Sequence, residues 1–290
     1  VCKAFGKSEK FLMTKASKAD ELTRIRKKEA KLRLIQSYPD EWLVFTGPYV
    51  KSVQHRIEHM FRAGTCFFYA GAATPEQLNE WLRQASQMMD THHFICIDYS
   101  MFDATHSDYS FDFVEYIYAA LIEPNHRPDK NMWDALKEMR WPKGILASRM
   151  RYAAGKTMNG SGRPDTSLLN IINSMFCLII TTAAVLHDID PKTVTVGHVR
   201  AVLDCLSIIA SGDDSVCVIP KFFNGKEIDL ASVQVKMAKY IAMFGFIAKV
   251  EPNPDFLNMV FLGSRPYPVD GEWFWGPTVG RRIVKHNFLH

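Results

Sequence analysis

The sequence has little that would build a disulfide framework or a zinc site. Its six cysteines form no CxxC pair and show no paired metal spacing, so we interpret them as reduced thiols of a cytosolic protein. It also lacks internal repeats and low-complexity segments, which argues against solenoids and disordered tails. What remains is 290 residues, 47% hydrophobic and 23% charged, a composition typical of a globular protein with a sizeable core.

The two ends of the sequence show neither a signal peptide nor a clear stop to the fold. The chain begins with Val1, without a charged-then-apolar pattern after it, and ends at His290 directly after an aromatic-rich stretch. A secretory signal would need that pattern. We therefore expect the chain to be an excerpt from a longer polypeptide.

One apolar run, residues 168–186, is about as long as a membrane-spanning helix. It contains Asn170, Asn173 and several hydroxyl side chains, and polar groups inside a bilayer are costly. We therefore predict a buried core helix here and no transmembrane segment.

Basic residues are concentrated at the N-terminal end. The formal net charge is +4, but residues 1–35 hold eleven Lys and Arg against four Asp and Glu, whereas the rest holds 24 basic and 27 acidic residues. Such a block indicates either a polyanionic partner or a solvated basic helix. Composition alone does not separate these two interpretations.

Periodicity and turn residues predict alternating helices and strands. Residues 1–35 are expected as basic loop and helix, and residues 32–50 as irregular or strand-like structure broken by Pro39 and Pro48. Helices are predicted over 51–62, 75–89, 111–122, 165–186, 198–202 and 229–244. Strands are predicted over 93–97, 145–152, 205–210, 215–219, 246–251 and 260–264. This order predicts an α+β fold with helices packed on an antiparallel sheet.

Three acidic residues stand at the ends of predicted strands. Asp98 follows an apolar strand, and Asp213 with Asp214 occupies the tip of a predicted hairpin, where Gly212 suits a positive φ. If the strands share a sheet, these carboxylates meet and repel one another unless a cation lies between them. Magnesium suits such oxygen ligands because it keeps waters and accepts phosphate oxygens. The alternative is a solvent-exposed acidic turn.

Order and spacing favour the first interpretation. Three motifs follow one another along the chain: DxxxxD from Asp98 to Asp103, SGxxxTxxxN from Ser161 to Asn170, and GDD from Gly212 to Asp214. Together they resemble the palm of RNA-dependent RNA polymerases of positive-strand RNA viruses, with details similar to tombusvirus-like and nodavirus-like members. The resemblance covers about residues 15–265.

This resemblance implies roles for the motif residues. Asp98, Asp213 and Asp214 would be catalytic and bind Mg²⁺, with Mn²⁺ as a substitute. Asp103 and Asn170 would recognise the ribose 2′-hydroxyl of the incoming nucleotide. The nucleotide-binding residues beside that contact would be Ser161, Gly162 and Thr166. Taken without the motif, Asn170 is a helix-buried amide that bonds its neighbours.

Three further segments resemble family motifs. Lys31 and Arg33 match the end of the basic motif F that covers the triphosphate, and Lys15 and Lys18 match its earlier part. A guanidinium clamps phosphate bidentately, although Arg33 is equally a surface residue of a basic run. Lys249 resembles the motif-D lysine that protonates the pyrophosphate leaving group, with a surface lysine as its alternative. Residues 261–265 resemble motif E, the hairpin that grips the primer.

The sequence departs from the family pattern at two places. Tombusvirus-like proteins often have Arg-Met before the motif-B Ser-Gly, whereas Asn159 and Gly160 stand here, so that arginine's phosphate contact is in doubt. Only 25 residues follow Arg265, so we expect the thumb to be largely absent. His106 is interpreted as a packed or solvent-exposed side chain, not a metal ligand.

Aromatic residues accompany the basic regions and have two interpretations. Stacking under template bases is one, and core packing is the one we favour for most of them. These residues are Tyr49, Phe67, Phe68, Tyr69 and Trp81.

Two competing functions share the palm. Reverse transcriptases usually carry a bulky aromatic residue in place of Asp103 and Tyr-x-Asp-Asp in place of residues 211–214, and both differences argue against that class. A catalytically silent RNA-binding palm is disfavoured because all three aspartates are intact. We conclude that RNA-dependent RNA synthesis is the best-supported function, with transfer of a nucleotide from NTP to the RNA 3′-hydroxyl by two metal ions.

The resemblance also divides the chain and implies its partners. Residues 1–93 are assigned to the fingers with motif F, residues 94–265 to the palm with motifs A to E, and residues 266–290 to the start of a thumb or a post-palm segment. Residues 124–160 are assigned to a fingers insertion. Expected partners are template and product RNA, nucleoside triphosphates and other viral replication proteins, in membrane-associated replication complexes of the host cytoplasm.

The basic N-terminal block leads to a prediction about RNA binding. If its lysines and arginines contact phosphates, RNA affinity falls steeply with rising salt because bound counterions are released. Fluorescence anisotropy of a labelled RNA, titrated at several salt concentrations, measures this slope. A flat salt response would contradict the assignment of the block to template or nucleotide binding.

Overall fold

The computed structural model describes residues 2–7, 33–122, 130–146, 151–253 and 255–278. A central five-stranded sheet organises most of them. Its neighbours are antiparallel except for the last pair, which is parallel. In spatial order the strands are β11 (Ala248–Asn253), β4 (His92–Tyr99), β8 (Asp214–Pro220), β7 (Ser207–Ser211) and β3 (Phe67–Tyr69). The predicted α+β class with an antiparallel-rich sheet is confirmed.

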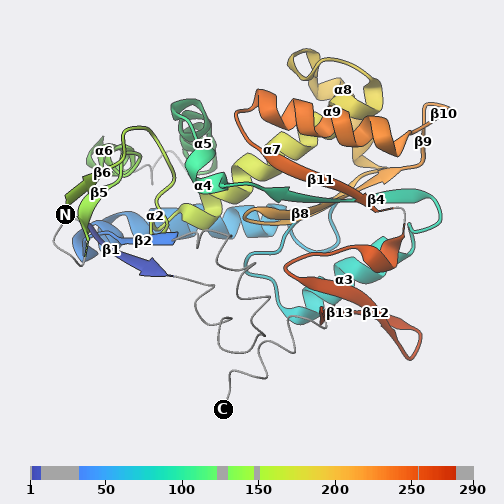
Figure 1. Ribbon diagram of the computed structural model, residues 1–290, viewed down its shortest axis with the longest axis horizontal. Helices are drawn as coiled ribbons and strands as arrows, with labels where there is room; N and C mark the ends of the chain where they lie inside the picture. The colour runs from blue at the N-terminus through green and yellow to red at the C-terminus, as the bar shows by residue number, and fades with distance from the viewer. Residues whose placement is uncertain (1, 8–32, 123–129, 147–150, 254, 279–290) are drawn as a thin grey trace, which may run out of the picture.

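Alternation along β4 divides the core into two layers. Ile95, Ile97 and Tyr99 are buried on one face of the sheet, and Phe94 and Cys96 on the other, as the period of two requires. The first layer lies under helices α5 (Asp108–Leu121), α7 (Thr166–His187), α8 (Val196–Leu203) and α9 (Leu230–Met243). The second lies under α3 (Pro75–Ser86) and the hairpin of β12 (Ser264–Val269) and β13 (Glu272–Pro277) (Figure 1).

Helix α7 is the axis of the larger layer. Among the described residues it is the one helix long and apolar enough to cross a membrane, and 89% of its most apolar window is buried inside the protein. It contacts α5, α8, α9 and β7 and runs through the middle of the molecule in Figure 1. The predicted buried core helix is therefore confirmed.

A second sheet joins segments that are far apart in the sequence. Its spatial order is β2 (Arg33–Ser37), β1 (Cys2–Lys7), β5 (Lys143–Leu146) and β6 (Arg151–Ala153). The residues described before position 8 thus form a strand, not the expected loop or helix. They pair with β5, which lies in the segment assigned to a fingers insertion.

The boundary at residue 93 does not separate the two sheets. Strand β3 pairs with β7, and α3 packs on β13, although both elements lie within residues 1–93. Likewise, the described part of residues 266–290 completes the β12–β13 hairpin on α3. Hydrogen bonding and packing, both long-range, attach these segments to the central sheet.

Helix α2 (Asp40–Met60) corrects the interpretation of residues 32–50. Part of the segment is strand β2, but the helix begins directly after Pro39 and continues through Pro48. Pro48 removes one backbone hydrogen bond, and an interior proline costs about 3 kcal/mol. Burial of Val50, Val53 and Ile57 on the following turns offsets that cost.

The predicted strand over 260–264 is wrong. Phe261 and Ser264 exchange both backbone hydrogen bonds, and the two residues between them have positive φ, 51° at Leu262 and 68° at Gly263. This is the pattern of a tight type I′ turn. Strand β12 begins only at Ser264, so the segment that resembles motif E is a turn followed by a strand.

The remaining elements connect these layers. They are α4 (Phe102–Thr105), α6 (Lys130–Glu138), η3 (Pro191–Thr193), β9 (Phe222–Phe223), β10 (Lys226–Glu227) and η4 (Phe256–Asn258). The Thr74 and Pro75 start predicted for α3 is confirmed, with a capping box between Thr74 and Gln77.

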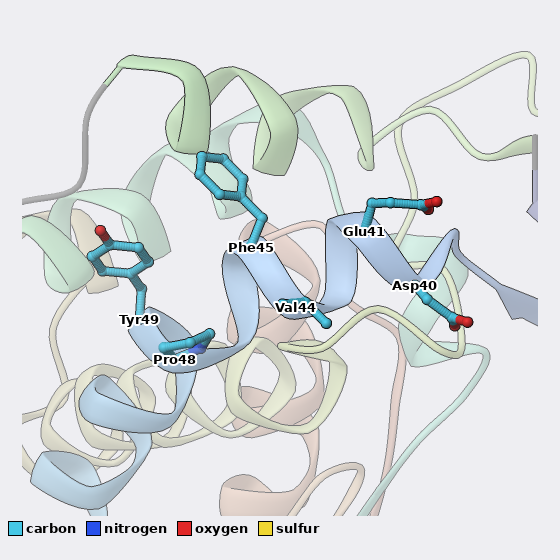
Figure 2. A pocket seen from close by; sticks show the side chains of 6 residues that line it. All are labelled: Asp40, Glu41, Val44, Phe45, Pro48 and Tyr49. Carbon is cyan, nitrogen blue, oxygen red and sulfur yellow. The ribbon is translucent and has the colours of Figure 1, made fainter.

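Most of the interleaved aromatics belong to the core. Phe67, Phe68, Tyr69 and Trp81 are buried, which favours packing over base stacking. Tyr49 differs, because it is only half-buried and lines a pocket along α2. Figure 2 shows Tyr49 and Phe45 projecting from the same side of that helix.

A buried ion pair holds the loop before α7. Arg163 Nε and Nη2 donate to Asp165 Oδ1 and Oδ2 at 2.8 and 2.9 Å, and both side chains are 2% exposed. The Tyr118 hydroxyl donates to Asp165 Oδ2 at 3.4 Å, and the guanidinium lies 4.9 Å from the centre of the Phe111 ring. The pair thereby ties the loop to α5.

Replacing Arg163 by Met tests the contribution of this pair to stability. Arg163→Met leaves the Asp165 carboxylate buried without a cation, so we expect a loss of about 3–5 kcal/mol in the free energy of unfolding. Urea denaturation measures it. The double variant Arg163→Met/Asp165→Leu should recover most of the loss, because no unpaired charge remains. Equal losses in both variants would contradict this account.

Candidate functional site

The pairing of β4 with β8 brings the three aspartates together. Asp98 lies directly opposite Asp214 in the antiparallel register, so the two side chains project from the same face of the sheet. The Asp213 carbonyl accepts a hydrogen bond from Tyr99 N–H at 3.3 Å, which places Asp213 beside the end of β4. Gly212 makes the turn possible with φ of +65°.

The pKa of the Asp98 carboxyl reflects the negative charges at this edge. Its pKa is raised first by partial burial, then by the negative charge of Asp213, while Lys249 lowers it. Asp98 and Asp213 are both exposed to solvent. Because an added cation would relieve the repulsion, the edge is suited to a divalent ion.

The carboxylates of the three aspartates suit magnesium only as part of a shared coordination shell. Within the described ranges, no three or more His, Cys, Asp or Glu side chains form a ready-made metal cage. Magnesium is commonly held by one or two carboxylates together with waters and substrate phosphates. The paired Asp98 and Asp214, with Asp213 beside them, match that shared arrangement.

Lys249 lies on the neighbouring strand. It is opposite Asp98 in the β11–β4 register and forms an ion pair with Glu251, two residues along the same strand. The bond to Glu251 and then its charge raise the pKa of the exposed ammonium group. The structure thus places a protonated lysine next to the aspartate edge.

A second polar cluster surrounds Asp103, just after β4. Its Oδ1 accepts hydrogen bonds from Asn170 Nδ2 at 2.9 Å and from Asn159 Nδ2 at 3.2 Å. Its Oδ2 accepts from Ser161 Oγ at 3.1 Å. Motif-A and motif-B residues are therefore in direct contact, as the resemblance implies for Asp103 and Asn170.

Met101 sets the path between the two aspartates of motif A. It adopts a left-handed backbone conformation with φ of 51° at the start of α4, which is unfavourable for residues other than glycine. Ser100 N–H donates to the carbonyl of Ile247, the residue before β11, at 2.7 Å and anchors this bend there. The bend carries Asp103 away from the strand and towards Asn170.

Thr166 and Gly162 shape the loop before α7. Thr166 Oγ1 is 2.9 Å from the Gly160 carbonyl and 3.1 Å from the Arg163 carbonyl, so its hydroxyl bonds the loop backbone. Gly162 has φ of +114°, a conformation that favours glycine. In this structure both residues hold the loop in which Ser161 faces Asp103.

Motif F lies largely beyond what can be described. Lys15, Lys18 and Lys31 are outside the described residues. The backbone of Arg33 opens β2, opposite Lys7 of β1. The roles predicted for Arg33 and Lys31 therefore stay predictions.

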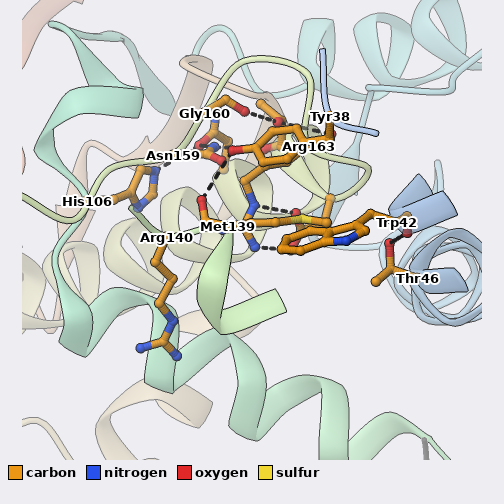
Figure 3. Close-up of polar contacts among 12 residues, drawn as sticks. Tyr38, Trp42, Thr46, His106, Met139, Arg140, Asn159, Gly160 and Arg163 are labelled. Atoms are coloured by element: carbon orange, nitrogen blue, oxygen red, sulfur yellow. Dashed lines mark hydrogen bonds and ion pairs between the residues drawn. The ribbon is translucent and has the colours of Figure 1, made fainter. Parts of the chain in front are cut away.

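Sequence reasoning missed two members of the Asp103 cluster. Asn159, fully buried, contacts both Asp103 and Asn170, and its backbone N–H donates to the Asp103 carbonyl at 2.8 Å. His106 packs among aromatic rings as expected, but its Nε2 also lies 2.8 Å from Asn170 Oδ1. Figure 3 shows the two side chains next to each other. The only signal in the sequence was Asn159 itself, in place of the expected arginine.

These two clusters define a polymerase palm, and the family comparison agrees. The family model for viral RNA-dependent RNA polymerases matches residues 5–271. The chain belongs to this family and is an RNA-dependent RNA polymerase, a nucleotidyltransferase that binds RNA and nucleoside triphosphates. Comparison with curated proteins gives no match. The kinship with tombusvirus-like and nodavirus-like members stays a prediction.

Burial of His106 predicts a pH-dependent stability. Desolvation lowers the pKa of His106 from 6.5 to about 4, although the bond to Asn170 opposes this. Between these values the unfolded chain is protonated at His106 and the folded chain is not, so stability falls as pH drops. The loss approaches about 3 kcal/mol near pH 4.

Urea denaturation between pH 7 and pH 4 measures this effect. The variant His106→Gln has no titrating group there, so its unfolding free energy should fall less over the same range. Identical pH profiles for parent and variant would show that His106 titrates normally in the folded protein.

Proposed function

We propose that this polymerase replicates a viral RNA genome by transferring nucleotides to the 3′-hydroxyl of growing RNA with two metal ions. The observation that carries the proposal is the register of β4 and β8, which sets Asp98 opposite Asp214 with Asp213 beside them. Carboxylates in that arrangement repel unless cations separate them. Enzymes of this family generally use divalent metals.

Asp98 and Asp213 would hold the ions, with Asp214 in support. Bound Mg²⁺, or Mn²⁺ as a substitute, would neutralise developing charge on the attacking and leaving oxygens. The chain's own contribution is to fix these carboxylates on adjacent paired strands, so that little reorganisation is needed. Lys249, opposite Asp98, would donate a proton to the departing pyrophosphate.

The Asp103 cluster would recognise the sugar of the incoming nucleotide. Asp103 accepts and Asn170 donates, so together they offer both partners that a 2′-hydroxyl needs. A deoxynucleotide would leave these polar groups unpaired, which is unfavourable. Ser161, Gly162 and Thr166 would shape the loop around that contact, and Arg33 with Lys31 would bind the triphosphate.

We further propose that the enzyme works with other viral replication proteins. Its place would be in membrane-associated replication complexes of the host cytoplasm. Residues 1–93 and 124–160 would contribute to the fingers. Support for the fingers assignment comes from the four-stranded sheet of order β2-β1-β5-β6, in which β1 pairs with β5.

Replacing Asp213 tests the catalytic proposal. Asp213→Asn removes one negative charge at the aspartate edge and should reduce nucleotide incorporation by at least about a thousandfold, the scale on which lost charge stabilisation slows such reactions. The measurement is extension of an RNA primer on an RNA template with Mg²⁺. RNA affinity, measured by anisotropy, should stay within about twofold because Asp213 is not expected to bind template.

The matched control is Asp134→Asn, because Asp134 is an exposed aspartate on α6. It loses the same charge away from the aspartate edge and should extend the primer at the parental rate. Full activity of Asp213→Asn would refute the assignment of Asp213, whatever the control does.

A further inference from the structure

The orientation of the Asn170 amide is defined by its neighbours. A carboxylate only accepts hydrogen bonds, so Asn170 must turn its Nδ2 towards Asp103 Oδ1, 2.9 Å away. Its Oδ1 then faces the other way, towards His106 Nε2 at 2.8 Å and Asn159 Nδ2 at 2.9 Å. The His106 ring must therefore carry its proton on Nε2.

Counting hydrogen bonds shows what this arrangement leaves open. Among the described residues, both lone pairs of Asn170 Oδ1 are used, by His106 and Asn159, and one Nδ2 hydrogen is used by Asp103. Asp103 accepts at three of its roughly four positions. One of these contacts comes from Asn159 Nδ2, whose two hydrogens are shared among Asn170 Oδ1, Asp103 Oδ1 and the Thr166 carbonyl at 2.9, 3.2 and 3.3 Å. One hydrogen on Asn170 and one lone pair on Asp103 remain. A hydroxyl group supplies their complement, one acceptor and one donor.

The residues behind Asn170 are held firmly. The His106 ring is 3% exposed and lies 4.9 Å from the ring of Phe102 and 5.4 Å from that of Phe246, measured between ring centres. Its Nδ1 lies 3.2 Å from Ser110 Oγ. The ring cannot turn away without breaking these contacts, so its Nε2 stays directed at Asn170.

Asn159 is held beside Asn170 although one of its own polar atoms lacks a partner. It has no exposed surface, and its Oδ1 finds no hydrogen-bond partner among the described residues. A buried acceptor without a partner costs about 1–3 kcal/mol. The contacts of Asn159 Nδ2 with Asp103, Asn170 and the Thr166 carbonyl offset this cost and fix the Asn159 amide beside Asn170.

We propose that His106 and Asn159 are positioning residues for sugar selection: by donating to Asn170 Oδ1, they lock its amide so that a donor stays aimed at the ribose 2′-hydroxyl. This rests on the proposed function, in which Asp103 and Asn170 recognise that hydroxyl. Neither His106 nor Asn159 touches the sugar. Both act through Asn170.

The test compares a ribonucleotide with its 2′-deoxy counterpart. We measure kcat/KM for CTP and for dCTP during RNA-templated primer extension, and take their ratio. His106→Leu removes one donor to Asn170, so the ratio should fall by about tenfold, the scale of one hydrogen bond. His106→Gln keeps an N–H donor and should retain the ratio within about twofold. Asn159→Ala should lower it by about tenfold or more.

The control is His187→Leu, the same substitution at a histidine away from Asn170. His187 lies at the C-terminal end of α7, where it packs against His198 and Phe223. Its ratio should match that of the parent. Circular dichroism identifies the variants that fold, and if His106→Leu does not, Asn159→Ala carries the same expectation.

Any of the following results would overturn the inference. Parental ratios in folded His106→Leu or Asn159→Ala would do so, as would equal losses for CTP and dCTP, which indicate a purely structural role. A ratio as low in His106→Gln as in His106→Leu would show that the donor is irrelevant. If the parent incorporates CTP no faster than dCTP, sugar recognition by Asp103 and Asn170 fails, and the inference fails with it.

Discussion

The register between β4 and β8 is the constraint on which the site depends. Because side chains alternate along a strand, a slip of one residue would send Asp98 to the opposite face from Asp214. The register is maintained by apolar residues buried on both faces of the two strands, such as Ile95 and Val216. Burial of these hydrophobic side chains thus offsets the repulsion between the negative charges that the register brings close together. The mutual repulsion that results makes the edge suitable for cations.

Local patterns in the sequence were enough for elements whose signals are local. The capped start of α3, the apolar strand β4, the β7–β8 hairpin and the buried α7 all follow from periodicity and turn residues. Other features depend on distant contacts. The pairing of β1 with β5 spans most of the chain's first half, and α2 tolerates Pro48 only because later turns are buried. Leu262 in a left-handed turn has no glycine to signal it.

The residues of the site also divide into those that sequence motifs indicate and those that only contacts in the folded chain reveal. The resemblance of the motifs implied that Asp103 and Asn170 act together, and the structure places them in hydrogen-bond contact. Spacing could not show that Asn159 and His106 complete the cluster, because their importance comes from burial and from the direction of one amide. Asn159 did stand out as a departure from the family pattern. Its meaning became clear only with its neighbours in place.

The anchoring of Asn170 also limits how this enzyme can change. Asn170 belongs to a helix packed on almost every side, whereas its partners lie on the short connections around residues 106 and 159. A substitution within the helix disturbs the core, whereas one at either connection changes the hydrogen bonds that orient the amide. Adaptation to nucleoside analogues with modified sugars would therefore involve residues on these connections as well as those that face the sugar.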